Sequence, residues 1–173
     1  VLASILPFTT ATGATQVWIP GSVDWDTDPA SLNWDTPPSD GIGEPWTNGN
    51  NALFDFGTGI VIVGAPGVEA SSITMLSPTT IDGAPLTLVG PARIDVSPGI
   101  TGTFDSQIAG SGGLQVGTSL PGRVILRAEN IYTGTTTVTG NAWLGLESDN
   151  ALGSTAEGTT VESGSTLALG NIE

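Results

Sequence analysis

The chain has 173 residues, with 25 Gly, 12 Pro and no Cys, and its three Arg stand against 17 acidic residues, for a net charge of −14. Such a surface repels nucleic acid and anionic membranes, and no stretch is long and apolar enough to span a bilayer. Because Lys, His and Cys are all missing, the usual general bases, thiol nucleophiles and Schiff-base amines are missing too. We therefore expect no enzyme activity, no nucleic-acid partner, no cofactor and no membrane-embedded segment.

Residues 1–14 begin with an apolar segment and end in small, polar residues. The large apolar side chains are those of Val1, Leu2, Ile5, Leu6 and Phe8. The pattern is similar to the end of a secretory signal with a cleavage site near Ala14. The alternative is that the segment donates a strand to the sheet edge of a neighbouring molecule. We treat the five apolar residues as candidate interface residues.

Residues 15–50 predict an irregular N-terminal cap that is rich in Trp and Asp. Large rings bury much area, so we expect Trp18, Trp25, Trp34 and Trp46 to cover the open first coil of the fold that follows. The alternative is an aromatic platform that stacks on sugars. Its candidate glycan-binding residues are Trp25, Trp34 and Trp46.

Four carboxylates in the same segment invite comparison with a calcium loop, which needs oxygen ligands at close spacing. They are Asp24, Asp26, Asp28 and Asp35. Pro29 stands where that loop needs Gly, and Asp35 replaces its final Glu. The four residues are therefore only a weak candidate site for calcium.

A repeat organises residues 51–173. The tripeptide Thr136-Thr137-Val138 returns as Thr159-Thr160-Val161, and Leu144-Gly145-Leu146 returns as Leu167-Ala168-Leu169, both after 23 residues. Two strand-like signals with one shared offset indicate stacked coils. Period-two alternation places one side chain inward and the next outward.

Two tracks of short strand-like triplets continue the repeat toward the N-terminus. The first is expected to stack Leu114-Gln115-Val116, Ile94-Asp95-Val96, Ile73-Thr74-Met75 and Phe54-Asp55-Phe56. The second is expected to stack Val124-Ile125-Leu126, Phe104-Asp105-Ser106, Leu86-Thr87-Leu88 and Val61-Ile62-Val63. Short strands without a helical stripe predict an all-β fold, a single parallel β-helix (β-solenoid) of about five to six coils. A β-sandwich remains the alternative, because it also has short strands and Gly-rich turns.

Several polar residues of the repeat have expected structural places. Tyr132 is expected at a corner, with its ring packed and its hydroxyl at the surface. Asn130, Asn141 and Asn150 lie beside turns, where Asn tolerates left-handed geometry. Stacked outward carboxylates would be the only remaining catalytic groups, by analogy with glycosidases. They are Asp55, Asp95 and Asp105.

Residues 112–173 carry a more specific pattern. Its pieces are Gly112-Gly113-Leu114, the run from Asn130 to Val138, Asp149-Asn150-Ala151-Leu152-Gly153, and Gly158-Thr159-Thr160-Val161 with Gly164-Ser165-Thr166-Leu167. The stretch resembles the autotransporter-associated β-strand repeat, also called the passenger-associated transport repeat. The resemblance implies a parallel β-helix, export and exposure at the bacterial cell surface. It transfers no catalytic residue.

The C-terminal strand leads to the functional hypothesis. Residues 167–169 leave a strand edge without a polar cap, and an unpaired strand edge is expected to pair with another strand. Leu167, Leu169 and the outward Trp143 are candidate interface residues. We expect a secreted, extracellular or cell-surface structural protein that assembles with other copies of itself into a fibre or sheath, by head-to-tail stacking or by strand donation. The alternatives are an adhesin segment that binds a polysaccharide or a host surface, and a spacer whose partner is the remainder of a larger chain.

Overall fold

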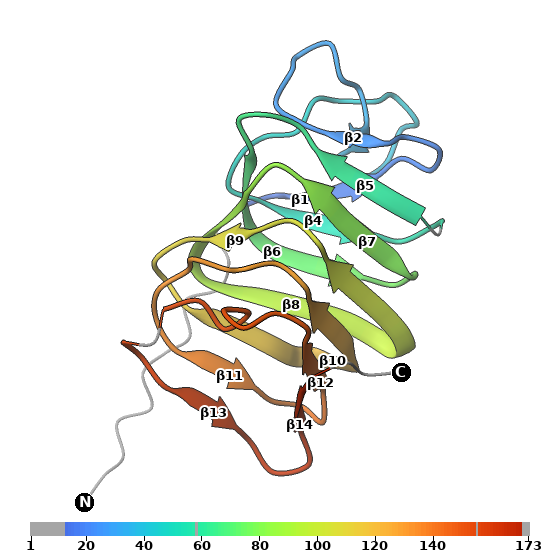
Figure 1. Ribbon diagram of the computed structural model, residues 1–173. Helices are drawn as coiled ribbons and strands as arrows, with labels where there is room; N and C mark the ends of the chain where they lie inside the picture. Colours follow the sequence, from blue (N-terminus) through green and yellow to red (C-terminus); the bar gives the residue numbers. More distant parts are fainter. Residues whose placement is uncertain (1–12, 58, 155, 171–173) are drawn as a thin grey trace, which may run out of the picture.

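The computed structural model describes residues 13–57, 59–154 and 156–170. Within these residues the chain forms 14 strands and no helix, wound into a β-solenoid of about five turns. Figure 1 shows the coils stacked one on another, from the end at β2 to the end at β13. The ladders between successive coils are parallel. The expected single parallel β-helix is therefore confirmed, and the alternative β-sandwich is wrong.

One side of the solenoid, which we call face A, runs through the whole stack. Its order is β1 (Thr15–Trp18), β4 (Asn50–Phe54), β6 (Val68–Met75), β8 (Leu86–Phe104), β10 (Leu114–Leu126), β11 (Thr136–Val138) and β13 (Thr159–Val161). A further strand, β3 (Trp34–Asp35), pairs antiparallel with β1. The inward column of face A is formed by Ala52, Ile73, Ile94, Val116 and Val138, all fully buried.

A second side, face B, follows face A along each coil, after a turn or within one bent strand, as in β8 and β10. Its order is β2 (Asp24–Trp25), β5 (Gly59–Val63), β7 (Thr79–Gly83), the C-terminal parts of β8 and β10, β12 (Trp143–Leu146) and β14 (Thr166–Leu169). Val61, Ile81, Phe104, Leu126 and Leu146 form its inward column. Each such buried side chain contributes roughly 1.5–3 kcal/mol to the stability of the fold.

The third side, face C, is the shortest. There the N-terminal part of β8 pairs with that of β6 on one side and with β9 (Ile108–Ala109) on the other. The next coil continues this side without a regular strand. Its backbone still bonds to the preceding coil: the amide of Ile131 donates to the carbonyl of Ile108 at 2.9 Å, and the amide of Thr133 donates to the carbonyl of Gly110 at 2.8 Å. The two predicted tracks do not include this third side.

The predicted register is confirmed in the last coils. Leu114–Val116, Thr136–Val138 and Thr159–Val161 stack as expected on face A. Val124–Leu126, Leu144–Leu146 and Leu167–Leu169 do so on face B. The stacking of Ile73-Thr74-Met75 on Ile94-Asp95-Val96 is confirmed as well.

Three other expected pairings are wrong by two residues. Val116 lies opposite Ile94, Met75 opposite Phe54, and Leu126 opposite Phe104. A slip of two residues leaves the same side chains inward, since the strand period is two. Alternation therefore cannot detect such a slip, whereas burial separates Phe54, which is fully buried, from Phe56, which is 65% exposed.

Two further expectations need correction. Leu86-Thr87-Leu88 lies on face C, opposite Val68–Ala70 and Ile108–Ala109, and β7 takes the expected place on face B. The solenoid also begins earlier than residue 51, because β1 and β2 already pair in parallel with β4 and β5. The segment 15–50 thus combines part of the first coil with the structures that cover it.

Candidate functional site: the two ends of the solenoid

The N-terminal end of the solenoid, which we call the closed end, is filled by aromatic rings. Trp18, Trp25, Trp34 and Trp46 pack around Phe54, with neighbouring ring centroids 4.6–5.8 Å apart. All four indoles are buried, Trp25 completely. The Nε1 group of Trp46 donates to the carbonyl of Glu69 at 3.2 Å, which ties the cluster to β6. Trp18 and Trp25 belong to β1 and β2 of the first coil, and Trp34 and Trp46 cover them as a further coil would.

Burial corrects the prediction of a glycan platform. Trp25, Trp34 and Trp46 are 0%, 1% and 4% exposed. A sugar stacks on a ring only where the ring face is open to solvent, and these faces contact one another instead. The three residues are therefore part of the core, and the interpretation of the cluster as a cap is the one that agrees with the packing.

The closed end is also blocked along its backbone. Val17 and Trp18 of β1 pair antiparallel with Asp35 and Trp34 of β3. The amide of Trp34 in turn donates to the carbonyl of Glu44 at 3.1 Å. The edge of β1 that faces away from β4 is thus occupied at Val17 and Trp18.

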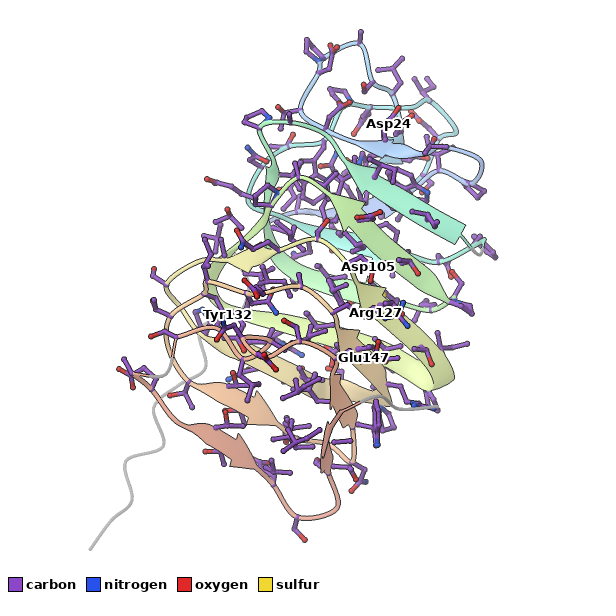
Figure 2. The ribbon with its side chains drawn as sticks, in the orientation of Figure 1. Asp24, Asp105, Arg127, Tyr132 and Glu147 are labelled. Atoms are coloured by element: carbon purple, nitrogen blue, oxygen red, sulfur yellow. The ribbon has the colours of Figure 1, made fainter. Side chains whose placement is uncertain are left out.

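Three of the four Asp residues proposed as a weak calcium site accept hydrogen bonds from the local backbone instead. Asp26 accepts from the amide of Asp28 at 3.0 Å, Asp28 from that of Ala30 at 2.9 Å, and Asp35 from that of Gly41 at 3.3 Å. Asp24 lies in β2, near the N-terminal end of the stack (Figure 2). Within the described part of the chain, no three acidic side chains come together as metal ligands. The arrangement gives no support to a calcium site.

The C-terminal end, which we call the open end, consists of β13 and β14. Among the described residues, β13 pairs only with β11, and β14 only with β12. The inward columns run out here: Val161 ends the column of face A at 41% exposed, and Leu169 ends that of face B at 78% exposed. The same columns are 0–7% exposed one coil earlier, at Val138 and Leu146.

The remaining expected interface residues lie in three different settings. Leu167 is partly buried against the core, and Leu169 borders a shallow hollow of about 500 Å³ beside Leu146, Ala151 and Leu152. Trp143 points outward from β12, and the guanidinium of Arg123 lies 4.2 Å from its ring centroid. Val1, Leu2, Ile5, Leu6 and Phe8 lie outside the described residues.

An ionic ladder supports the corner that follows face B (Figure 2). Arg127 donates from Nε to Glu147 at 2.7 Å and lies 3.7 Å from Asp105, one coil to either side. The hydrogen bond to Glu147 is the main cause that raises the pKa of Arg127 above its ordinary value. Sequence analysis placed Asp105 in a possible catalytic row, and this ion pair gives it a structural role instead.

A second polar network was missed by sequence reasoning. Residues 118–120 of β10 fold over face A, where Asp95 accepts from Thr118 Oγ1 at 3.0 Å and from the amide of Ser119 at 2.8 Å. Arg93 lies 3.4 Å from the same carboxylate. Asp95 is only 6% exposed, so it does not form an open carboxylate row with Asp55. The irregular spacing before Pro121 is the sequence feature that could have indicated this network, and the ladder to β8 shifts register there.

Tyr132 is the principal interior polar group of the late coils. Its side chain is 1% exposed, and its hydroxyl lies 2.7 Å from Thr136 Oγ1. The expected hydroxyl at the surface is therefore wrong, since the hydroxyl is paired inside the solenoid. Burial raises the pKa of Tyr132 to about 12.

Comparison with protein-family models, with curated proteins and with solved structures finds no match for this chain. No helix among the described residues has the length and apolar character needed to cross a membrane. The difference between the two ends of the solenoid is therefore the structural basis for a functional proposal.

Proposed function

We propose that this chain is a non-enzymatic structural protein of the bacterial cell surface or extracellular matrix, and that it associates with other copies of itself through the open end. The observation that carries the proposal is the difference between the ends. One end is filled by buried indoles and edged by an antiparallel strand. Within the described ranges, the other end presents strands paired on one side only, with Val161 and Leu169 exposed.

The chemistry of the open end supports association over solubility. Natural sheet edges are usually protected by Lys, Pro or a bulge. In the segment 158–170 there is no Lys and no Pro, and Glu162 is the only charged residue. The chain as a whole carries a net charge of −14. Two copies therefore repel each other least where they approach through an edge with so little charge.

The surface location is supported by the repeat resemblance of residues 112–173 and by the acidic composition. The composition also supports a structural role, because the chain has no His, Lys or Cys, and the carboxylates Asp95 and Asp105 are engaged with Arg93 and Arg127. The indoles that suggested polysaccharide binding are buried, so they do not support that alternative.

The test is self-association measured by sedimentation velocity over a wide range of protein concentration. The double variant Val161→Lys/Leu169→Lys places charge on the open end, and we expect it to weaken association at least about tenfold. The matched control is Val89→Lys/Ile131→Lys, whose parent residues are exposed at 43% and 59% away from that end. Equal effects of the two double variants, or a monomer at every concentration, would contradict the proposal.

A further inference from the structure

We infer that the outer surface of face A carries a binding site for a neutral, linear oligosaccharide. The site is a groove of about 450 Å³, a volume within the range of small-molecule sites, roughly 300–1,000 Å³. Its floor is formed by outward side chains of β1, β4, β6 and β8, and its wall by Ser119 and Leu120 of β10. The groove lies along the side of the solenoid, so this inference is independent of association through the open end.

Parallel stacking arranges the outward side chains of the groove in two rows. Asn51, Ser72 and Arg93 lie opposite one another in successive coils and form a polar row. Leu53 and Thr74 form the row beside it. Polar groups next to an apolar side chain fit a sugar, because the hydroxyl groups of a sugar lie around the edge of its ring and the C–H groups cover its two faces.

A buried carboxylate fixes the wall of the groove. Residues 117–122 depart from the regular coil, and the ladder to β8 shifts register there. Asp95, which is 6% exposed, holds this segment by accepting from the amide of Ser119 at 2.8 Å and from Thr118 Oγ1 at 3.0 Å. Leu120, the next residue, lines the groove. The wall is therefore in position before a ligand arrives, which lowers the cost of binding.

The polar row is also held in place, yet it keeps donors for a ligand. Ser72 Oγ donates to Asn51 Oδ1 at 2.8 Å. Arg93 uses Nε and Nη2 for hydrogen bonds to Thr118, Ser119 and Asp95. A guanidinium has five N–H groups, and the two on Nη1 have no partner in the described part of the chain. Because the Arg93 side chain is 36% exposed, these two groups can donate to the oxygen atoms of a sugar.

The charge balance favours a neutral ligand. Asp95 lies 3.4 Å from Arg93 and balances its charge, and the chain as a whole carries a net charge of −14, so a polyanion is repelled.

The length of the polar row favours a linear ligand. Arg93 also borders a second hollow of about 410 Å³, together with Gln115 and Thr137, which continue the row in the next two coils. Neighbouring coils are about 4.8 Å apart, close to the advance per sugar of an extended polysaccharide. A chain of sugars that runs along the stack therefore fits this surface better than a single sugar does.

The test is binding of uncharged hexasaccharides to the full chain, measured by isothermal titration calorimetry. The probes are cellohexaose, maltohexaose, xylohexaose and mannohexaose, with hexagalacturonate as the charged comparison. We expect at least one neutral probe to bind, and its single sugar to bind at least about tenfold more weakly. We also expect the affinity for the neutral probe to be insensitive to salt, because its binding neutralises no charge.

Two variants and a matched control locate the site. Arg93→Met removes the free donors, whereas Ser72→Leu fills the floor and leaves Asp95 and its partners unchanged, so the second variant decides if the first loosens the wall. We expect each variant to lower the affinity at least about tenfold. The control Arg123→Met removes the same charge from face B, where Arg123 lies over Trp143, and we expect no measurable loss of affinity. Circular dichroism checks that each variant is folded.

Failure of all four neutral probes to bind would overturn the inference. Equal losses of affinity in Arg93→Met and Arg123→Met would do the same, since they would indicate an effect of overall charge. A preference for hexagalacturonate that falls steeply with salt would show that the ligand is an anion, and it would also contradict the inference. None of these results bears on association through the open end, which is measured without a sugar.

Discussion

The closed and open ends of this solenoid are built on the same coil but treat their inward residues differently. At the closed end, Trp34 and Trp46 pack against Trp18 and Trp25 of the first coil, in the place of a neighbouring coil. At the open end, the columns stop at Val161 and Leu169, with nothing from the described chain above them. The comparison shows that burial in a solenoid is supplied by the neighbouring coil, and that the closed end replaces this coil with packed rings.

The largest expected effect is the removal of a ring from the closed end. Trp25 is fully buried and contacts Trp34, Trp46 and Phe54. We expect Trp25→Ala to lower the free energy of unfolding by about 3–5 kcal/mol, because it leaves a large cavity. Urea unfolding followed by circular dichroism measures this value. A loss below about 1 kcal/mol would mean that the cap does not stabilise the fold.

Between the ends, Tyr132 takes over as the main buried aromatic residue of the late coils. Its pKa is raised to about 12 because the ring is buried, whereas the unfolded chain ionises at about 10. The contribution of the neutral phenol is therefore fully present below pH 10 and is lost as the pH rises toward 12. The loss amounts to roughly 2–3 kcal/mol.

The chain has a single Tyr, so tyrosinate absorbance reports this group alone. We expect a native titration midpoint near 12, and a decrease in stability above pH 10 that Tyr132→Phe removes. A native midpoint near 10 would show that the ring is open to solvent. At neutral pH, Tyr132→Phe should cost about 1–2 kcal/mol, since it leaves the buried Thr136 hydroxyl without its partner.

How much of this fold could be read from the sequence depended on how regular the coils are. The last coils repeat both their strand triplets and their turn lengths, so the register of Thr136 on Thr159 and of Leu144 on Leu167 was correct. The earlier coils contain insertions, such as residues 117–122, that change the spacing without changing the alternation. Two-residue errors followed there, because the inward face is the same in both registers.

The candidate site was harder to predict, because it depends on which groups are covered. The sequence left a glycan platform as the alternative to a cap at Trp25 and predicted an outward Asp95, but burial by segments distant in the chain removes both side chains from the surface. Conversely, the block at the closed end depends on β3, a strand of two residues that has no periodic signal. The stacking of residues 167–169 on β12 was predicted correctly, since these residues belong to the regular coils.

A smaller effect is expected from the ionic ladder that joins the middle coils to the late ones. Arg127→Met removes the ion pairs with Asp105 and Glu147 but keeps much of the aliphatic side chain. Because Arg127 is 46% exposed, solvent screens these pairs, and we expect a loss of about 0.5–1 kcal/mol that shrinks at high salt. A loss unaffected by salt would indicate packing as the main contribution of this side chain.

The smallest expected effect lies at the open end and gives the sharpest version of the comparison. Leu126 and Leu169 belong to one inward column of face B, yet they are 0% and 78% exposed. Leu126→Ala should cost about 2–5 kcal/mol, whereas Leu169→Ala should change the stability of the monomer by no more than about 0.5 kcal/mol. Unfolding at low protein concentration measures both values.

A larger cost for Leu169→Ala at high concentration would follow if association covers that side chain, because binding to the native state adds to its stability. A large cost for Leu169→Ala at low concentration would mean that this residue is already buried in the monomer, and the distinction between the two ends would no longer hold.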